Sequence, residues 1–456
     1  GSDATAVGSG AADAATGATY LTAVGKNAAG GLLTGTGNTA IGYQSLMFAD
    51  GTEARNVALG AHAARFCDGT NDCIAIGYGA LSGANISGDA SGDTANATKP
   101  TGNYNIAVGN YALDANTTGN TNIAIGYNAL TTNTGGDRCV AVGYQALRLQ
   151  NPSGSVDMHN TAVGYEAGTS VTGGTHNTLV GSVAGTDLTA GTSNAVFGYA
   201  ALNNDTLGKY ATAIGTFALQ DQNFTDASGT AENNYNVGVG YKAGKSMTTG
   251  KFNTISGGLA VSTGVLVGSY NVVSGYNAAE NATDMATSVF VGANAGSEGV
   301  ITGASNTVVG YAAGNDLTSG GSNTLIGREA GANITTAQNN TVIGKGAWAT
   351  GVGVASGGSA GQYNVVVGGG AGNQLTSAYS NILIGNDAGT NLTNNSHNIA
   401  IGHYALDGCD GGEIGNIAIG HGALSADIAG SDYCVAIGYN ALTAQNANVK
   451  NTAIGG

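Results

Sequence analysis

One short motif of apolar residues and glycine returns along the whole chain, and its spacing limits the fold more than any other feature. The motif reads Asn-Ile-Ala-Ile-Gly-Tyr-Asn-Ala-Leu at 122–130 and recurs in related form from Gly8 to Gly455. Of the 24 intervals between its glycines, 15 are 17 residues long and five are 18. A fixed short period is typical of a solenoid, in which each repeat stacks on the next. We therefore predict one repeat domain over 1–456, with about 24 coils.

The residues before each glycine form columns of constant chemistry. The third and first residues before it are mostly Val, Ile or Thr, which predicts a short strand. The second residue before it is apolar as well, so we expect one strand face to line the coil and the other to pack against further chains. The fourth residue before it is Asn in 18 of 25 copies. This column predicts an amide ladder between coils, with members Asn38, Asn56, Asn122, Asn160, Asn323 and Asn416.

The residues after each glycine complete the predicted coil. The third one is Ala in 23 of 24 complete copies, which indicates a place where two backbones approach closely. We expect a strand, a glycine turn, a second short strand through this Ala, and a polar turn. The fold class is thus an all-β parallel β-solenoid. A 17-residue coil encloses little apolar interior, which favours association between chains.

Composition excludes several functions. Only 9% of the residues are charged, and the formal net charge is −15. Without a basic cluster, nucleic acid is not an expected partner, and no apolar run is long enough for membrane insertion. The sequence contains no nucleophile elbow, P-loop or dinucleotide-binding fingerprint, so we expect neither an enzyme nor a cofactor.

The motif Asn-x-Ala-Ile-Gly-x-x-Ala, as at Asn122–Ala129, Asn398–Ala405 and Asn416–Ala423, resembles the head repeats of trimeric autotransporter adhesins. The longer form with Tyr after the glycine is similar to repeats in bacteriophage tail fibres. This resemblance implies a left-handed parallel β-roll, a homotrimer and a receptor-binding surface. The 17-residue period is longer than that of the adhesin heads.

These features favour a fibrous protein that binds a cell surface, as a trimeric segment of a tail fibre or adhesin. We expect an extracellular location, on a virion or a bacterial surface. The expected partners are two further copies of the chain and a host-surface glycan or protein. Two alternatives stay open: a purely structural extracellular filament, and a polysaccharide-degrading tailspike. We also expect the 456 residues to be a segment of a longer chain.

The four long intervals between glycines place insertions near 82–101, 148–159, 220–234 and 349–363. Binding residues of solenoids often lie on such loops, because loops vary without disturbing the stack. Polar side chains with an occasional aromatic suit a surface contact. The candidate receptor-binding residues are Asp89, Asp93, Asn96, Lys99, Phe224, Asp226, Glu232 and Tyr235.

Other residue types give weaker hypotheses. Cys67 and Cys73 share a loop, so a disulfide between them competes with two buried thiols. His403 and His421 follow successive glycines but lack a third metal ligand, and the acidic stretches 68–72 and 407–413 lack the EF-hand spacing. We therefore predict no metal site. Tyrosines directly after the glycine favour a packing ladder over a sugar-stacking column; they are Tyr43, Tyr78, Tyr127, Tyr144, Tyr165, Tyr199, Tyr241, Tyr276, Tyr311 and Tyr439.

Overall fold

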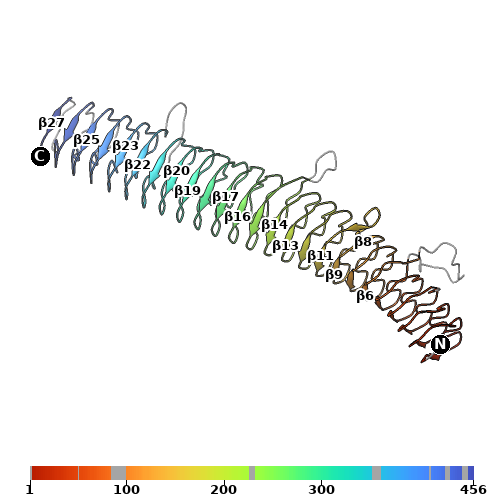
Figure 1. The fold of residues 1–456 in the computed structure, drawn as a ribbon. Coiled ribbons are helices and arrows are strands. Elements are labelled where there is room, and N and C mark those ends of the chain that lie inside the picture. Colours follow the sequence, from red (N-terminus) through yellow and green to blue (C-terminus); the bar gives the residue numbers. More distant parts are fainter. Residues whose placement is uncertain are drawn as a thin grey trace. The chain divides into compact units, whose positions relative to one another are not determined.

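The computed structural model describes residues 3–49, 51–83, 99–224, 232–351, 361–409, 412–426, 432–443 and 450–456. The chain divides into two compact units, Gly1–Tyr235 and Asn236–Gly456. In both units successive strands lie side by side as coils of a parallel β-solenoid (Figure 1). The described residues contain no helix with the length and apolar character that a membrane crossing needs.

The first unit is built on a ladder of three-residue strands. Each strand ends directly before a motif glycine and pairs in parallel with its equivalent one coil later, for example Thr39 with Val57. A two-residue pair, β8 (Gly136–Asp137) and β10 (Val156–Asp157), lies outside this ladder. The ladder strands are β1 (Thr5–Val7), β2 (Thr22–Val24), β3 (Thr39–Ile41), β4 (Val57–Leu59), β5 (Ile74–Ile76), β6 (Ile106–Val108), β7 (Ile123–Ile125), β9 (Val140–Val142), β11 (Thr161–Val163), β12 (Thr178–Val180), β13 (Ala195–Phe197) and β14 (Thr212–Ile214).

The second unit repeats the same parallel ladder with the same register. Its strands are β15 (Val237–Val239), β16 (Thr254–Ser256), β17 (Val272–Ser274), β18 (Val289–Val291), β19 (Thr307–Val309), β20 (Thr324–Ile326), β21 (Thr341–Ile343), β22 (Val365–Val367), β23 (Ile382–Ile384), β24 (Ile399–Ile401), β25 (Ile417–Ile419), β26 (Val435–Ile437) and β27 (Thr452–Ile454).

The two faces of each strand have different surroundings. The middle residue points into the coil and is fully buried, as Ala40, Ala124 and Leu383 are, whereas the residues beside it face outward. The middle residue is Ala in most strands from β2 to β11 and from β24 to β26, and it is mostly larger in between, as Leu179 and Phe290 are. The alternation follows from the two-residue period of a strand.

The Ala that stands three residues after a motif glycine also lies in the interior of the coil. Ala129 and Ala146, each three residues after a motif glycine, are fully buried, and Leu130 and Leu147 beside them are buried too. Trp348 is the largest fully buried side chain of the described residues, and its indole N–H donates to the carbonyl oxygen of Leu375 at 2.7 Å. The core is therefore a narrow column of mostly small and aliphatic side chains inside the coils, with a few aromatic ones such as Phe290 and Trp348.

The predicted second strand through this Ala is wrong. The segment after Gly126 is a run of turns, because Asn128 and Leu130 adopt left-handed backbone angles, with φ of 55° and 51°. A strand requires negative φ at these positions. The backbone still bonds between coils: the N–H of Asn128 donates to Asn110 O, and that of Leu130 donates to Ala146 O, each at 3.1 Å. The coil therefore has one strand and a compact turn segment.

Candidate functional site

The asparagine column before the glycines forms a buried hydrogen-bond ladder, which Leu21 and Ala211 interrupt because their side chains carry no acceptor. Oδ1 of Asn160 accepts the backbone N–H of Asn177 at 2.9 Å, and Oδ1 of Asn177 accepts that of Asn194 at 3.1 Å. The amide nitrogen of Asn177 donates to the turn carbonyl of Gly191 at 2.9 Å. Buried backbone groups cost free energy unless they are paired, so each side chain joins a strand start to a turn of the next coil. Asn38, Asn56, Asn122, Asn323 and Asn416 accept a backbone N–H in the same way.

Residues other than Asn continue the ladder at some coils. Oγ of Ser288 accepts the backbone N–H of Asn306 at 3.1 Å, and Sγ of Cys73 accepts that of Asn105 at 3.4 Å. Sγ of Cys73 also donates to the turn carbonyl of Gly102 at 3.6 Å, whereas Oγ of Ser288 donates to Ala286 O in its own segment at 3.0 Å. The column is thus a structural element of the coil.

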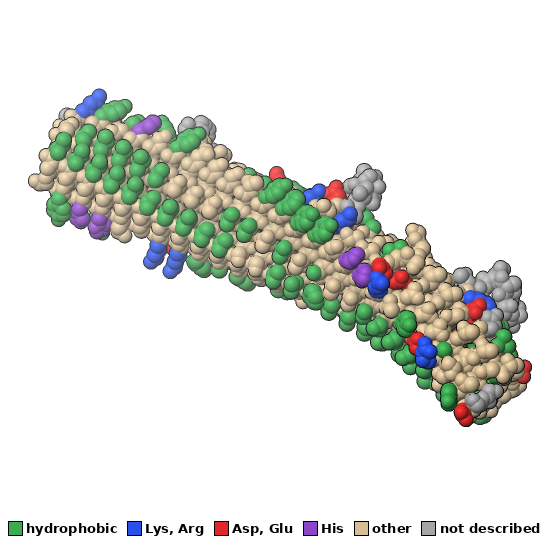
Figure 2. All heavy atoms as spheres, viewed as in Figure 1, with side chains coloured by type: hydrophobic (Ala, Val, Ile, Leu, Met, Phe, Trp, Pro, Cys, Tyr) green, Lys and Arg blue, Asp and Glu red, His purple; other side chains and the backbone are tan. Residues whose placement is uncertain are grey.

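The outward residues of the strands form a surface that we call the outer flank, defined as the third and first residues before each motif glycine. Its side chains are mostly Val, Ile and Thr, and they repeat at every coil. Figure 2 shows hydrophobic side chains as regular stripes over the strands near β22 to β27. Contiguous exposed apolar surface is typical of interaction sites. More than a third exposed are Leu59, Ile125, Phe197 and Ile214 in the first unit and Val239, Ile384 and Ile401 in the second.

An aromatic column borders the turn segment of the first unit. The rings of Tyr127 and Tyr144 stack with centroids 5.4 Å apart, and those of Tyr144 and Tyr165 stack at 5.2 Å. Earlier in the column, His62 makes edge contacts with Tyr43 and Tyr78. Neighbouring stacked rings cover one another's faces, which leaves their edges and hydroxyl groups toward solvent.

A second aromatic column lies five residues before the glycines, and the sequence reading missed it. Tyr210 stacks on Tyr235 with centroids 4.9 Å apart, and Phe252 stacks on Tyr270 at 4.8 Å. Tyr210 has φ of 63°, so a left-handed backbone turn directs the ring outward. The residue type varies at this position, which hid the column, although the recurrence of Tyr was a usable signal. Members more than half exposed are Tyr20, Tyr104, Tyr270, Tyr363 and Tyr433.

The described candidate loop residues are found in different surroundings. Lys99 pairs with the carboxylate of Asp68 at 2.9 Å. Phe224 is 3% exposed, so its ring lies in the core and is not available at the surface. Tyr235 is 45% exposed and stacks on Tyr210, and the carbonyl of the nearby Glu232 accepts the backbone N–H of Lys209 at 2.8 Å. Asp89, Asp93, Asn96 and Asp226 lie outside the described residues.

Lys99 belongs to the loop between β5 and β6, whereas Phe224, Glu232 and Tyr235 belong to the segment after β14. The ladder from β6 to β14 separates these two segments by several coils. The structure therefore does not bring the described candidate residues into one site.

The hypothesis of a disulfide between Cys67 and Cys73 is wrong in this structure. Cys67 and Cys73 are buried and form no disulfide, and Cys139, Cys409 and Cys434 are buried thiols as well. Burial raises the pKa of Cys67 far above its usual range and raises the pKa of Cys73 to about 11. The Cys73 sulfur instead takes part in the ladder described above. Thiols protonated by burial react slowly.

The histidine and acidic stretches show ring contacts and ion pairs. The rings of His403 and His421 lie 5.2 Å apart edge to face, and His403 also stacks on Tyr404. Asp72 pairs with Arg55. Within the described ranges, no group of three or more His, Cys, Asp or Glu residues is placed to hold a metal ion. Asp410 of the second acidic stretch lies outside those ranges.

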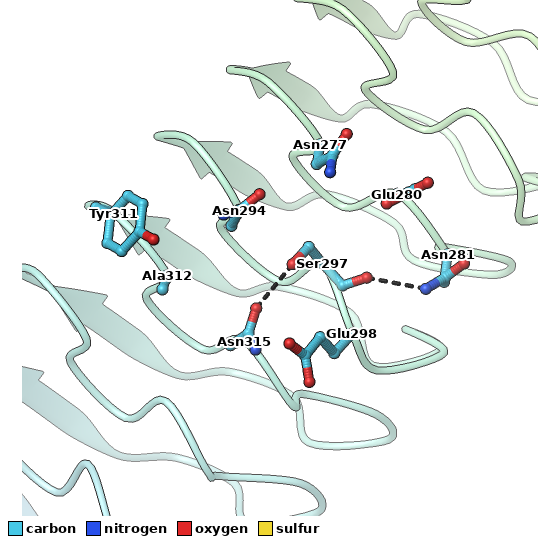
Figure 3. A pocket seen from close by; sticks show the side chains of 9 residues that line it. All are labelled: Asn277, Glu280, Asn281, Asn294, Ser297, Glu298, Tyr311, Ala312 and Asn315. Carbon is cyan, nitrogen blue, oxygen red and sulfur yellow. Dashed lines mark hydrogen bonds between the residues drawn. The ribbon is translucent and has the colours of Figure 1, made fainter.

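A polar hollow of about 560 Å³ opens on the turn segments that follow β17, β18 and β19 in the second unit (Figure 3). One side carries Asn277, Asn294 and Tyr311, and the other carries residues five or six after the glycines, namely Glu280, Asn281, Ser297, Glu298 and Asn315. Its lining includes the carboxylates Glu280 and Glu298. The volume falls within the usual range of ligand sites.

Hydrogen bonds fix one side of this hollow. Asn281 Nδ2 donates to the carbonyl oxygen of Ser297 at 2.9 Å, and Oγ of Ser297 donates to Asn315 Oδ1 at 2.7 Å (Figure 3). Oγ1 of Thr263 donates to Asn281 Oδ1, which orients that amide. The pKa of Asp316, beside this row, is raised by burial and by the charge of Glu298. The hollow therefore has an ordered polar wall and a negative potential.

Comparison with protein-family models and with curated proteins finds no match for the chain.

Proposed function

We propose that the chain is a segment of a homotrimeric extracellular fibre, of the tail-fibre or adhesin kind, that binds a host-surface glycan or protein. The observation that carries this proposal is the outer flank, which presents aliphatic side chains at coil after coil. Ile125 and Ile214 in the first unit, and Ile384 and Ile401 in the second, are each 37–41% exposed.

The physical reason for association is the cost of leaving this flank in water. Burial of apolar surface contributes about 25 cal/mol per Å², and a flank repeated along a solenoid adds this gain at each coil. Parallel strands are usually buried on both faces. Packing of three copies along their outer flanks would cover the second face, and the resemblance of the repeats to trimeric fibre proteins supports the number three.

The charge and polarity of the other surfaces fit an extracellular binding role. The net charge of −15 disfavours anionic partners, and only 9% of residues are charged. Exposed tyrosines such as Tyr20, Tyr104 and Tyr363 offer aromatic contacts next to turns rich in Asn, Thr and Ser. Aromatic rings together with amide and hydroxyl groups are suited to recognition of glycans and protein surfaces.

Electron microscopy of the purified chain, followed by binding of the labelled protein to a printed glycan array and to intact bacterial cells, tests the proposal. We expect discrete fibres of uniform length that bind a limited set of glycans or strains. Open-ended polymers without binding would instead favour a structural filament. Release of reducing ends from the bound glycans would favour a depolymerase.

A further inference from the structure

We propose that the hollow after β17, β18 and β19, lined by Tyr311, Glu280 and Glu298, is a subsite for a neutral sugar ring rather than for a sialic or uronic acid. This inference rests on the proposed function and assigns a receptor chemistry to one place on the chain. It was not among the loops that the sequence indicated.

The first argument is the ring of Tyr311. Tyr311 is 51% exposed, and the guanidinium of Arg328, from the following coil, lies over its ring at 5.8 Å. The hollow's other residues come from the same coil and the two coils before it. The ring therefore stands at the end of the hollow, and a sugar ring can pack against it through its C–H groups, as other apolar groups pack on aromatic faces.

A small residue in the preceding coil leaves space beside the Tyr311 ring. Ala293 occupies the position equivalent to Tyr311, so the aromatic column is interrupted there. Where aromatic residues follow successive glycines, as at Tyr127, Tyr144 and Tyr165, the stacked rings fill the corresponding places. Coils repeat at about 4.8 Å, so one missing side chain leaves the width of a single ring.

The second argument is the arrangement of hydrogen-bonding groups. The amides of Asn281 and Asn315 are held by the row through Ser297 and do not need to reorganise when a ligand binds. Asn277 Oδ1 is buried and has no hydrogen-bond partner. A sugar hydroxyl group is a donor that can satisfy such an acceptor, and it can also donate to a carboxylate in a short charge-assisted bond.

The charge of the hollow selects among sugars. Glu280 and Glu298 form no ion pair with any lysine or arginine of the described residues, and Asp316 lies close enough for Glu298 to raise its pKa. Arg328, whose guanidinium lies over the Tyr311 ring, pairs with Glu329 at 2.9 Å. A carboxylated or phosphorylated sugar would meet uncompensated like charge, which is unfavourable. Neutral hexoses and N-acetylhexosamines avoid this repulsion.

The test is saturation-transfer NMR and calorimetry on the full chain with defined oligosaccharides. The neutral probes are tetramers of glucose, galactose, mannose and N-acetylglucosamine, and the acidic probes are sialyllactose and tetragalacturonate. We expect at least one neutral probe to bind and both acidic probes to fail. Tyr311→Ala should weaken the association constant about tenfold, whereas Tyr311→Phe should retain it.

Tyr241→Ala is the matched control, because Tyr241 also follows a motif glycine and has Lys242 over its ring at 5.1 Å, yet it does not line the hollow. It should change binding by less than about twofold. Glu298→Gln keeps the shape of the side chain and should weaken binding of the neutral probe. Binding of the acidic probes to this variant should stay weaker than binding of the neutral probe to the wild-type chain.

The inference is overturned if no neutral probe binds, if Tyr311→Ala and Tyr241→Ala have equal effects, or if an acidic probe binds more tightly than every neutral one. Each of these results leaves the oligomeric state and the array binding of the wild-type chain unchanged. Failure of the subsite is therefore distinguishable from failure of the proposed function.

Discussion

The side-chain Oδ1 of Asn160 accepts the backbone N–H of Asn177, one coil further along, at 2.9 Å. This bond recurs at coil after coil and joins the start of one strand to the side chain of the previous coil. Its donors and acceptors are buried, so removal of one side chain leaves the groups that bonded to it without a hydrogen-bond partner, because water does not reach them. The stability of the stack should therefore depend on single asparagines.

Substitution of Asn323 by Ala should lower the free energy of unfolding by about 2–4 kcal/mol, because two buried backbone groups lose their partners. These groups are the N–H of Asn340 and the carbonyl of Ala337. Hydrogen exchange at Asn340 and urea unfolding measure the effect. Asn323→Ser is the control and should cost less, since Ser288 already accepts a backbone N–H at this position. Equal losses for both variants would contradict the ladder as the cause.

Gly126→Ala should destabilise the coil by about 3 kcal/mol or more, since left-handed strain and overpacking act together. Gly126 has φ of 136°, and an added Cβ would press on the carbonyl oxygen of Gly143. Gly346→Ala is the control, because Gly346 has φ of 63° with open space around it, and should cost about 1 kcal/mol. Limited proteolysis and thermal unfolding compare the two. Similar melting temperatures would argue against the close glycine contact.

Asp114 gives a prediction for pH. Burial raises its pKa from 3.8 to about 6, despite a hydrogen bond from Ser82. The folded state thus holds its proton more tightly than the unfolded state, so stability is greatest below about pH 4 and falls as the pH rises to about 6. The penalty above pH 6 is at most about 3 kcal/mol.

Asp114→Asn should remove this loss of stability. The free energy of unfolding of the variant, followed by circular dichroism, should exceed that of the wild type by an amount that grows between pH 4 and 6. Asp72→Asn is the opposite control: Arg55 lowers the pKa of Asp72, so its removal should not stabilise the protein at neutral pH. A pH-independent difference between wild type and Asp114→Asn would count against a titrating buried carboxyl group.

The cysteines test the interior directly. All five are buried and none forms a disulfide, and burial raises the pKa of Cys67 and Cys73. Iodoacetamide should therefore label them slowly in the native protein and completely in denaturant, as read by mass spectrometry. A disulfide between Cys67 and Cys73 would lower the mass of the chain by two hydrogens. It would also protect both residues from labelling in denaturant without reductant, and this result would contradict the structure.

The glycine spacing was sufficient to predict the solenoid, because each strand ends directly before a motif glycine, as β7 does before Gly126. A two-residue alternation cannot tell which face points inward, so the burial of Ala124 and the exposure of Ile125 required the structure. The turn segment was mistaken for a strand because residues such as Leu130 do not by themselves indicate a left-handed angle. The glycines that stand at the same position in other coils, such as Gly168 and Gly314, were a signal for a turn that was not used.

The candidate binding site was less predictable than the fold. Long intervals between glycines pointed to loops, yet the hollow lies at coils of normal length, on the turn segments that carry Asn277, Asn294 and Tyr311. Its polar wall depends on side chains such as Ser297 and Asn315 that come together only when coils stack. A period in the sequence shows which positions are equivalent, but it does not show which side chains of neighbouring coils line a hollow.

The outer flank makes the most direct prediction about association. Ile384→Asn together with Ile401→Asn places polar groups in the flank, where each native side chain is 37–38% exposed. Val265→Asn with Val300→Asn is the matched control, because both valines are more than half exposed but lie outside the flank. We expect dissociation of the first variant and no change in the second.

Native mass spectrometry of the wild-type chain, 44.3 kDa by sequence, over a dilution series tests the central claim most directly. The account predicts a single species containing three copies, which the flank variant converts to single chains and the control variant leaves intact. A wild-type chain that is monomeric at all concentrations, with its flank open to water, would contradict it.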